Sequence, residues 1–478
     1  MRCGARVQLA LWFTALAGFT CAAAGGDPGV PAVGAAGPVG KAAVSGSNQR
    51  QTSEDAVTPA PYTYTLGGTW EQEWAVADRG GNQKFEALLE PRLDVRFRSG
   101  ASLTAIARLR LDALDELGPS AQRPFNYSAV NGPWYNDGNA AIDLREFYLD
   151  MQLGGAYLRL GKQQVVWGES DGIKVLDVVN PQSFREFILK DPAASRIPLW
   201  TVNVELPAGP GGVLQLLWIP DTTYDELAES GTPYALTSPL VVPRRPPGME
   251  VTLLEPDRPD RLIADSDAGA RYRVTAGGWD VSLNYLYSYA DFPVPFQRLQ
   301  WRAGKPVGVM QPAYRRNHLL GATASSVFGD VTLRTEVAWN SDRWFTSSDR
   351  SAQGVEKSAD IASVLGLDWQ ASASSVVSGQ WFYNRALDHE STMERGQNEQ
   401  IVSLLLQHSW ANDAWEFRTL ALHSLDYSDS LYQVKLKYWF SSAVELWVGA
   451  DIFDGTGFGL FGQYDDHDRL LVGLQYGF

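Results

Sequence analysis

Cysteine is almost absent from this sequence of 478 residues: it occurs only as Cys3 and Cys21. Residues 1–24 carry a positive start, an apolar stretch too short to span a bilayer as a helix, and the small residues Ala22–Ala24. This arrangement is typical of a secretory signal peptide. Cleavage after residue 24 leaves a chain without cysteine, which excludes disulfide frameworks and cysteine-based sites. An uncleaved anchor helix and a lipid-modified Cys21 are the alternatives.

Long apolar runs are also missing. After residue 24, no uninterrupted apolar stretch approaches the roughly 18 residues that a membrane helix needs, so no transmembrane helix is expected. Basic residues are in the minority, with 40 Lys and Arg against 55 Asp and Glu, which disfavours a nucleic-acid partner. What the chain does contain is 12% aromatic residues and 45 glycines, a composition that fits a barrel whose strands are apolar on one face only.

Alternation of apolar and polar residues divides the chain in two. Residues 25–61 are rich in Gly, Ala, Pro and Ser without periodicity, so we expect a flexible periplasmic tail there. Over 62–478 the chain consists of short segments, such as 103–111 and 147–153, in which apolar side chains recur at every second position. That is the period of a β-strand, and it predicts an all-β domain. Arg145 falls on the apolar side when the alternation of 147–153 is extended backward, and we expect it to lie beyond the lipid-facing band.

The connections between these segments differ systematically in length. Turns of a few residues, such as 98–101, 153–156 and 276–279, interleave with long polar stretches. The long stretches are 113–140, 166–199, 220–268, 290–314 and 341–360. Short turns at one end and long loops at the other are typical of outer-membrane barrels, and counting hairpins gives about 18 strands. The sequence therefore predicts a transmembrane antiparallel up-and-down β-barrel in the outer membrane of a Gram-negative bacterium, with both termini in the periplasm.

The last segment ends the chain on an aromatic residue. Val472, Leu474, Tyr476 and Phe478 share one face of the predicted final strand. Strands of this kind close barrels that the outer-membrane assembly machinery inserts. We therefore expect Tyr476 and Phe478 to form the assembly signal and that machinery to be a partner of the chain.

Charged side chains occupy the second face of several predicted strands. Because charge that faces lipid is costly at the middle of a bilayer, these side chains should point into the lumen. They are Arg92, Asp94, Arg96, Arg108, Arg110, Glu146, Asp150, Arg159, Arg271 and Arg273. One interpretation is an arginine wall facing carboxylates, which sets a transverse field for polar or anionic solutes. The other is a salt-bridged polar filling that closes a narrow barrel.

Residues 166–199 form the third of the predicted extracellular loops. The Asn-Pro pair at 180–181 predicts a helix start, with Asn as the N-cap and Pro at the first helical position. Phe184, Phe187 and Ile188 would then share one face of that helix. We expect this loop to fold inward and narrow the pore, and a helix on the outer surface is the alternative. The polar residues of the expected constriction are Glu169, Asp171, Asp177, Asn180, Arg185 and Arg196.

Catalytic and metal-binding patterns are weak throughout. Residues 168–172 match the G-x-S-x-G motif of esterases, but such an elbow joins a buried parallel strand to a helix, whereas the strand before Ser170 alternates. The five histidines are scattered without ligand spacing. The acidic residues at 465–468 lack the spacing of a calcium loop and are assigned to a solvated loop. We therefore expect no enzyme, no cofactor and no metal site.

Two stretches resemble a known family. The first is residues 159–171 (RLGKQQVVWGESD), continued by 177–181 (DVVNP) and 196–198 (RIP), and the second is 459–465 (GLFGQYD) with 468–478. Together they resemble the proteobacterial outer-membrane barrels grouped as a family of unknown function. These barrels are similar in architecture to alginate-export-type porins and are often associated with resistance–nodulation–division exporters. The resemblance implies contact with outer-membrane lipid and lipopolysaccharide and an inner-membrane exporter as a partner, but it assigns no functional residue.

The sequence thus favours an outer-membrane channel or porin-like transport protein for small solutes. The alternative is a non-conducting barrel that passes a hydrophobic molecule or lipid across the outer membrane in partnership with an exporter. An outer-membrane hydrolase that uses Ser170 is a third interpretation. A TonB-dependent transporter is disfavoured, because residues 25–61 are too few for a plug and the chain is too short for about 22 strands.

Overall fold

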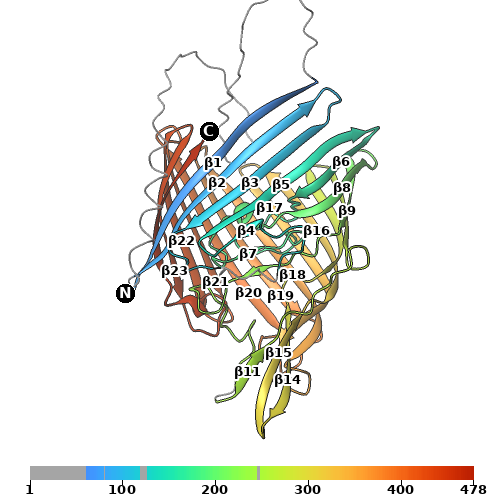
Figure 1. The fold of residues 1–478 in the computed structure, drawn as a ribbon. Helices are drawn as coiled ribbons and strands as arrows, with labels where there is room; N and C mark the ends of the chain where they lie inside the picture. Colours follow the sequence, from blue (N-terminus) through green and yellow to red (C-terminus); the bar gives the residue numbers. More distant parts are fainter. Residues whose placement is uncertain (1–60, 80, 119–125, 245–247) are drawn as a thin grey trace, which may run out of the picture.

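The computed structural model describes residues 61–79, 81–118, 126–244 and 248–478, and within them eighteen antiparallel strands form one closed barrel. The first strand, β1 (Tyr62–Ala77), pairs with the last, β24 (Arg469–Gly477), and this pairing closes the wall (Figure 1). The predicted fold class and strand number are confirmed. The expected signal peptide (1–24) and nearly all of the expected tail (25–61) lie outside the described residues.

The wall strands vary in length from 8 residues in β6 to 18 residues in β18. Between β1 and β24 the wall contains β2 (Asn82–Phe97), β3 (Ser102–Asp112), β5 (Ala140–Leu153), β6 (Ala156–Gln163), β8 (Leu199–Pro207), β9 (Gly212–Ile219), β12 (Asp267–Ala276), β13 (Trp279–Tyr289), β16 (Arg316–Phe328), β17 (Val331–Thr346), β18 (Val355–Ser372), β19 (Ser375–Ala386), β20 (Asn398–Trp410), β21 (Trp415–Ser424), β22 (Asp429–Ser441) and β23 (Val444–Asp454). The loops contain β4 (Tyr135–Asn136), β7 (Ser183–Phe184), α1 (Pro192–Ser195), β10 (Glu226–Leu227), β11 (Glu250–Leu253), β14 (Val294–Arg302), β15 (Lys305–Ala313) and the 3-10 turn Gly462–Tyr464. Strands β11, β15 and β14 form a separate sheet that projects beyond the barrel (Figure 1).

The connections have the predicted asymmetry overall, although the β1–β2 and β21–β22 connections at the long-loop end are also short and one predicted long stretch is mostly strand. Short turns lie at the end of the barrel where the chain finishes, and the long loops lie at the other end (Figure 1). In one short turn Gly277 and Gly278 both have positive φ, 61° and 82°, as a two-residue hairpin of the favoured twist requires. The stretch that is mostly strand is 341–360, of which only 347–354 is a loop, because β17 and β18 continue into it. Its polar residues include lumen-facing strand positions, such as the fully buried Asp360, whose charge was wrongly taken as a sign of a loop.

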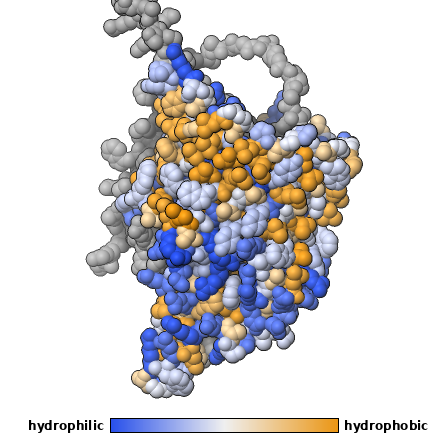
Figure 2. All heavy atoms as spheres, turned by 90° about the vertical axis from the view of Figure 1, so that its right-hand side faces the viewer, coloured by the Kyte–Doolittle hydropathy of each residue, from blue (hydrophilic) through white to orange (hydrophobic). Residues whose placement is uncertain are grey.

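The outer face of the barrel is apolar. On β18, for example, Leu365, Leu367 and Trp369 are exposed at alternate positions, whereas Val364 points inward and is buried. Figure 2 shows hydrophobic side chains gathered mainly over the upper part of one side and hydrophilic side chains mainly below them. A closed barrel satisfies its backbone hydrogen bonds internally and can expose such a face only to lipid. The protein is therefore a multi-pass β-barrel of the outer membrane. In the part of the chain that the structure describes, no helix is long and apolar enough to cross a membrane.

A β-bulge in β5 reverses the alternation at Arg145. The register between β3 and β5 shifts here, so that Arg145 is an extra residue between Leu144 and Glu146. Its side chain is 7% exposed, and the guanidinium donates to the carbonyl oxygens of Ala193 at 2.7 Å and Arg196 at 2.5 Å inside the barrel. The backward extension of the alternation therefore assigned Arg145 to the wrong face, because one extra residue inverts the parity of a strand.

The apolar core lies inside the barrel, between the wall and loop 3, which we define as residues 164–198 between β6 and β8. One cluster surrounds Trp167 and Leu176 of this loop. A second cluster surrounds Phe187 and contains residues of two later loops, among them Tyr234 and Phe461, together with wall residues of β20 to β23. Folded loops therefore occupy much of the lumen toward the long-loop end.

Candidate functional site

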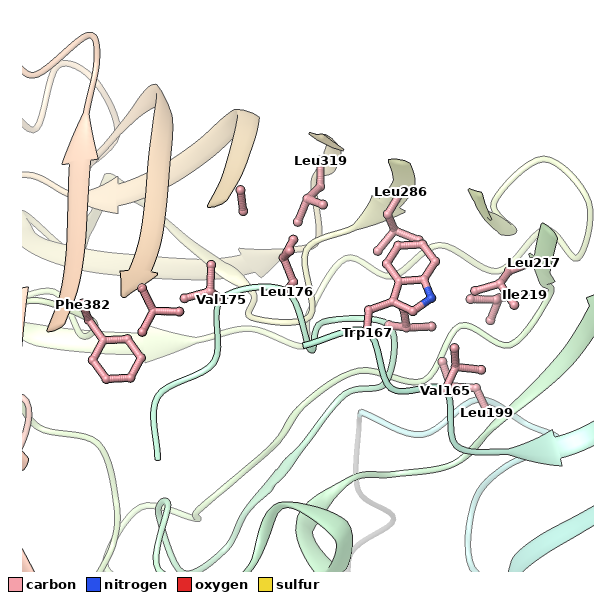
Figure 3. Packing of buried hydrophobic residues seen from close by; sticks show 13 residues of the cluster. Val165, Trp167, Val175, Leu176, Leu199, Leu217, Ile219, Leu286, Leu319 and Phe382 are labelled. Carbon is pink, nitrogen blue, oxygen red and sulfur yellow. The ribbon is translucent and has the colours of Figure 1, made fainter. Parts of the chain in front are cut away.

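Loop 3 crosses the lumen and packs against the wall (Figure 3). Trp167 is 1% exposed and lies against Leu217 and Leu286, and its indole N–H donates to Gln215 Oε1 at 2.9 Å. Further along the loop, Leu176 lies against the inner face of the wall beside Leu319 (Figure 3). The structure thus places this loop where the sequence predicted it, inside the barrel.

The backbone of loop 3 is fastened to Glu336 on β17. The carboxylate of Glu336 accepts from the backbone N–H groups of Glu169 at 2.5 Å and Leu176 at 3.1 Å. Asp171 pairs with Arg334 at 3.0 Å and accepts from Gln380 at 2.7 Å. Each of these contacts joins residues more than 150 positions apart, and the sequence alone gave no sign that Glu336 would take part in them.

The two ends of loop 3 are clamped together by Asn180. Its side chain accepts from the backbone N–H of Val165 at 2.7 Å and donates to the carbonyl oxygen of Ile197 at 3.0 Å. Asp177 adds a second clamp through Arg196 at 2.7 Å and Lys174 at 2.8 Å. Asn180 and Asp177 are therefore side chains that shape the loop.

The helix predicted after the Asn-Pro pair at 180–181 does not form. Phe184 lies in β7, which pairs with β10, and Phe187 has a φ of 50°, which no right-handed helix contains. Phe187 instead packs against Tyr464 with ring centroids 4.8 Å apart. The only helix of loop 3 is α1. Tertiary packing of the apolar side chains has overridden the local capping signal.

Loop 3 is also held by a buried cluster of charges, which we call the anchor cluster: Glu73, Lys84, Glu86, Arg185, Glu186 and Arg469. Glu186 pairs with Lys84 at 2.9 Å and with Arg469 at 2.7 Å. Arg185 pairs with Glu86 at 2.5 Å and with Asp112 at 2.8 Å. Burial alone would raise the pKa of Glu186, but the surrounding cations, Lys84 above all, hold it well below its usual range.

The anchor cluster was only partly visible in the sequence. Arg185 was assigned to the constriction, and the structure makes it one of the residues that fix the loop to the wall. Lys84 and Glu86 share the lumen face of β2 with Arg92, so the same alternation could have found them. Arg469 shares the lumen face of β24 with Gly473 and Gln475, so alternation could have found it too, whereas Glu186 carries no local signal.

The predicted arginine wall lies on the lumen face, where its members are largely ion-paired. Arg92 pairs with Asp94 at 2.6 Å and Arg159 with Asp150 at 2.7 Å. Arg108 pairs at 2.7 Å with Glu90, which the sequence interpretation did not include. Three of the remaining members form hydrogen bonds: Arg110 donates to Gly118 O at 3.4 Å, Glu146 accepts from Gln164 at 2.8 Å, and Arg271 donates to Val166 O at 3.2 Å. Arg96 lies opposite Thr63 on β1. Arg273 lines a cavity together with Arg159 and Glu205.

A cavity of about 490 Å³ lies between loop 3 and the wall strands β21 to β24. Its loop side includes Ile188, Asp191 and Pro192, and its wall side includes Arg418 and Lys435. Burial alone would raise the pKa of Asp191, but Lys435, Arg418 and Lys437 lower it. The cavity combines cations with apolar surface.

The serine of the G-x-S-x-G motif lies in loop 3 and has a structural partner. Ser170 Oγ donates to the carbonyl oxygen of Ile173 at 2.7 Å. Gly168 is needed for a close approach, because a Cβ there would lie 2.7 Å from the backbone nitrogen of Asp177. Among the described residues, no group of three or more His, Cys, Asp and Glu could hold a metal ion.

Several solved structures are similar to this chain in fold. One is OccK5 (OpdH) of Pseudomonas aeruginosa, at 10% sequence identity and a TM-score of 0.47, covering 87% of this chain and 97% of that one. Another is OpdK of the same organism, solved with vanillate, at 10% identity and a TM-score of 0.47, covering 87% and 98%. OmpT of Vibrio cholerae, as a loop deletion mutant, matches at 11% identity and a TM-score of 0.39, covering 88% and 100%. No curated protein matches the sequence. Residues 94–447, well over half of the chain, match the model of the family described as "Protein of unknown function (DUF1302)", and the chain belongs to that family.

Proposed function

We propose that the protein is an outer-membrane channel for small polar solutes, in which loop 3 forms the constriction. The observation that carries the proposal is the cavity of about 490 Å³ that remains between loop 3 and β21 to β24. A loop that merely sealed the barrel would pack against this wall as it packs around Trp167. Instead, charged and polar side chains such as Lys435, Arg418 and Gln475 line the gap.

The lining of the lumen supports a polar solute. Toward the short-turn end, Arg92 and Asp94 keep 47% and 35% of their side chains exposed although they are paired. Fixed charges on both sides of a narrow path favour hydrated or ionic solutes and hold back apolar ones. Ion pairing in the arginine wall leaves alternating charges along the path and reduces the net field that each arginine sets.

The proposal is tested by placing a reporter on the constriction. Ile188 lies in loop 3 and lines the cavity, so Ile188→Cys can be modified with a cysteine-reactive sulfonate during planar-bilayer recording. We expect wild-type channels to conduct and the modified variant to lose a large part of its conductance, since the reagent adds bulk and charge at the narrowest point. Val327→Cys, at an exposed position near the end of β16, is the matched control, and wild type treated with the reagent is the second. A conducting Ile188→Cys variant that does not respond to modification would contradict this placement of the path.

One observation favours the hydrophobic-cargo alternative. Strand β6 pairs with β5 only from Phe147 to Leu153. In the part of β5 that precedes Phe147, the edge that β6 leaves free pairs only with the two-residue β4. Trp134 and Val130, in the segment beside this seam, are exposed by 69% and 67%. A barrel that released a lipid sideways would need such a seam, with an exporter supplying the cargo. This alternative requires a barrel that does not conduct, so the same wild-type bilayer recording separates the two functions.

A further inference from the structure

Two cations face the cavity side by side without a counter-ion. Arg418 on β21 and Lys435 on β22 are direct cross-strand partners, and both side chains are partly buried. Among the described residues, no carboxylate oxygen lies within 4.0 Å of either side chain. Like charges directly opposite each other on a sheet destabilise the pairing, so this arrangement is unfavourable unless an anion is present.

The other cations that line this cavity are neutralised by carboxylates. Lys437 pairs with Glu445 at 3.0 Å and Arg469 with Asp451 at 2.7 Å. Lys190 lies 3.4 Å from Glu71, and Lys174 and Arg343 have partners of their own in Asp177 and Asp360. The absence of a partner is therefore specific to the pair Arg418 and Lys435.

Loop 3 presents one carboxylate toward this pair without reaching it. Asp191 lines the same cavity, and its pKa is affected by Lys435 and Arg418 although it forms no ion pair with them. Gly449 lies directly opposite Lys435 on β23, and the side chain of Leu471 packs over this glycine, so the surface beside the lysine is apolar.

Apolar surface borders the same space. Trp447 lies with its ring centroid 5.8 Å from Lys435 Nζ, and Phe184, Ile188 and Leu471 line the cavity with it. A volume of about 490 Å³ matches that of small-molecule sites, which combine apolar walls with a few charged groups that fix orientation. Guanidinium groups bind carboxylates through two parallel hydrogen bonds, and an adjacent ammonium adds a point charge.

We propose that Arg418 and Lys435 form a binding subsite for the carboxylate of a small organic acid, whose apolar ring or chain lies against Trp447 and Phe184. This subsite rests on the proposed channel function, since it would be the point on the path where the solute pauses. The substrate class that follows is organic monocarboxylates with an apolar part. Inorganic anions lack the apolar part, and neutral amides of the same shape lack the negative charge.

The test is binding in detergent solution, measured on the full chain by ¹⁹F NMR titration of 4-fluorobenzoate. We expect saturable binding to wild type and binding weaker by at least about tenfold in the double variant Arg418→Gln, Lys435→Gln. The matched control is Arg273→Gln, which removes a lumen-facing cation from a different cavity and should leave binding unchanged. The charge-preserving exchange Arg418→Lys, Lys435→Arg should keep binding within a few-fold, which guards against loss of fold in the double variant. Heat-modifiable migration of each variant on a gel checks that its barrel has formed.

Specificity is tested with two further probes. 4-Fluorobenzamide, which has the ring without the charge, and fluoroacetate, which has the charge without the ring, should both bind more weakly than 4-fluorobenzoate. Equal binding of 4-fluorobenzoate to wild type and the double variant overturns the subsite, and equal binding of either probe overturns the substrate class. Binding in solution without conductance would leave the subsite in place and count against the channel. Conductance without any binding of 4-fluorobenzoate would support the channel and overturn the subsite.

Discussion

The Nζ atom of Lys84 on the wall strand β2 lies 2.9 Å from a carboxylate oxygen of Glu186, which is 102 residues further along the chain in loop 3. Both side chains are almost fully buried, with 0% and 3% exposure. Breaking this pair would detach a buried cation of the wall from loop 3, although Lys84 would keep Glu73 as a partner at 2.7 Å. The position of loop 3 therefore depends on a few charged contacts as well as on apolar packing.

Glu186→Gln should loosen loop 3. The substitution removes the carboxylate that joins Lys84 and Arg469 to loop 3. Lys84 keeps Glu73 at 2.7 Å and Arg469 keeps Asp451 at 2.7 Å, so the cost should lie below the about 3–5 kcal/mol of a buried charge left without a partner. We expect faster hydrogen exchange of the backbone amides in residues 184–190, measured by mass spectrometry. Asp466→Asn, which breaks the exposed pair with Arg79, is the matched control and should leave that exchange unchanged. If residues 184–190 of the Glu186→Gln variant exchanged at the wild-type rate, apolar packing alone would be sufficient to hold loop 3.

Acid should release the same loop only at low pH. The pKa of Glu186 in the folded protein lies well below its usual range, because nearby cations, first Lys84, outweigh the effect of burial. A carboxylate of this kind contributes stability that is complete above its unfolded pKa of about 4.3 and is lost as the pH falls through the folded value. Current fluctuations caused by movement of loop 3 should therefore be absent from neutral pH down to about pH 5 and appear only well below pH 4. Fluctuations that begin between pH 5 and 7 would point to another titrating group.

Replacing Arg108 and Arg110 with serine should lower anion preference. Arg108 is paired with Glu90, so its removal exposes an unbalanced carboxylate to the lumen as well as deleting a cation. The effect should appear as a reversal-potential shift under a salt gradient and should shrink at high salt, because the Debye length is about 10 Å at 0.1 M and about 3 Å at 1 M. Unchanged selectivity in a conducting double variant would assign these arginines to a purely structural role.

Deleting Phe478 should impair assembly. Its backbone N–H donates to Gly68 O at 3.1 Å, and its carbonyl accepts from Gly68 N–H at 2.9 Å, which extends the pairing of β1 with β24 that closes the barrel. The ring stacks beside Tyr476 with centroids 6.1 Å apart. We expect reduced amounts of heat-resistant barrel in outer membranes, whereas Phe440→Ala, at an exposed aromatic residue of β22, should leave the amount near the wild-type level. Normal levels of the deletion variant would argue against the terminal aromatic as an assembly signal.

Ser170→Ala should leave any esterase activity of the purified protein at its background. The hydroxyl donates to Ile173 O within a loop turn, an arrangement that aims it at the backbone. Hydrolysis of a p-nitrophenyl ester by wild type and variant, each treated alike, gives the measurement. A reproducible activity that the substitution abolishes would overturn the proposal of a non-catalytic channel.

The sequence by itself determined the wall. Alternation with period two assigns each side chain to lipid or lumen without reference to distant residues, and turn residues such as Gly277 and Gly278 mark the reversals locally. The third extracellular loop was also recognisable, because its position follows from counting strands. The lumen face of β2 was legible enough that Lys84 and Glu86 could have been found beside Arg92.

Only the tertiary structure decided what the lumen contains. Glu186 meets Arg469 across 283 positions and Leu176 meets Glu336 across 160, and contacts at such separations leave no periodic trace in a single sequence. The bulge at Arg145 was hidden for a related reason, since an extra residue is defined by the register of the neighbouring strand. The helix expected after Asn180 failed because Phe187 gains more from packing against Tyr464 than from helical hydrogen bonds. A strand of a barrel is specified by its own two faces, whereas the path of a loop inside the barrel is specified by the many wall side chains that it contacts at once.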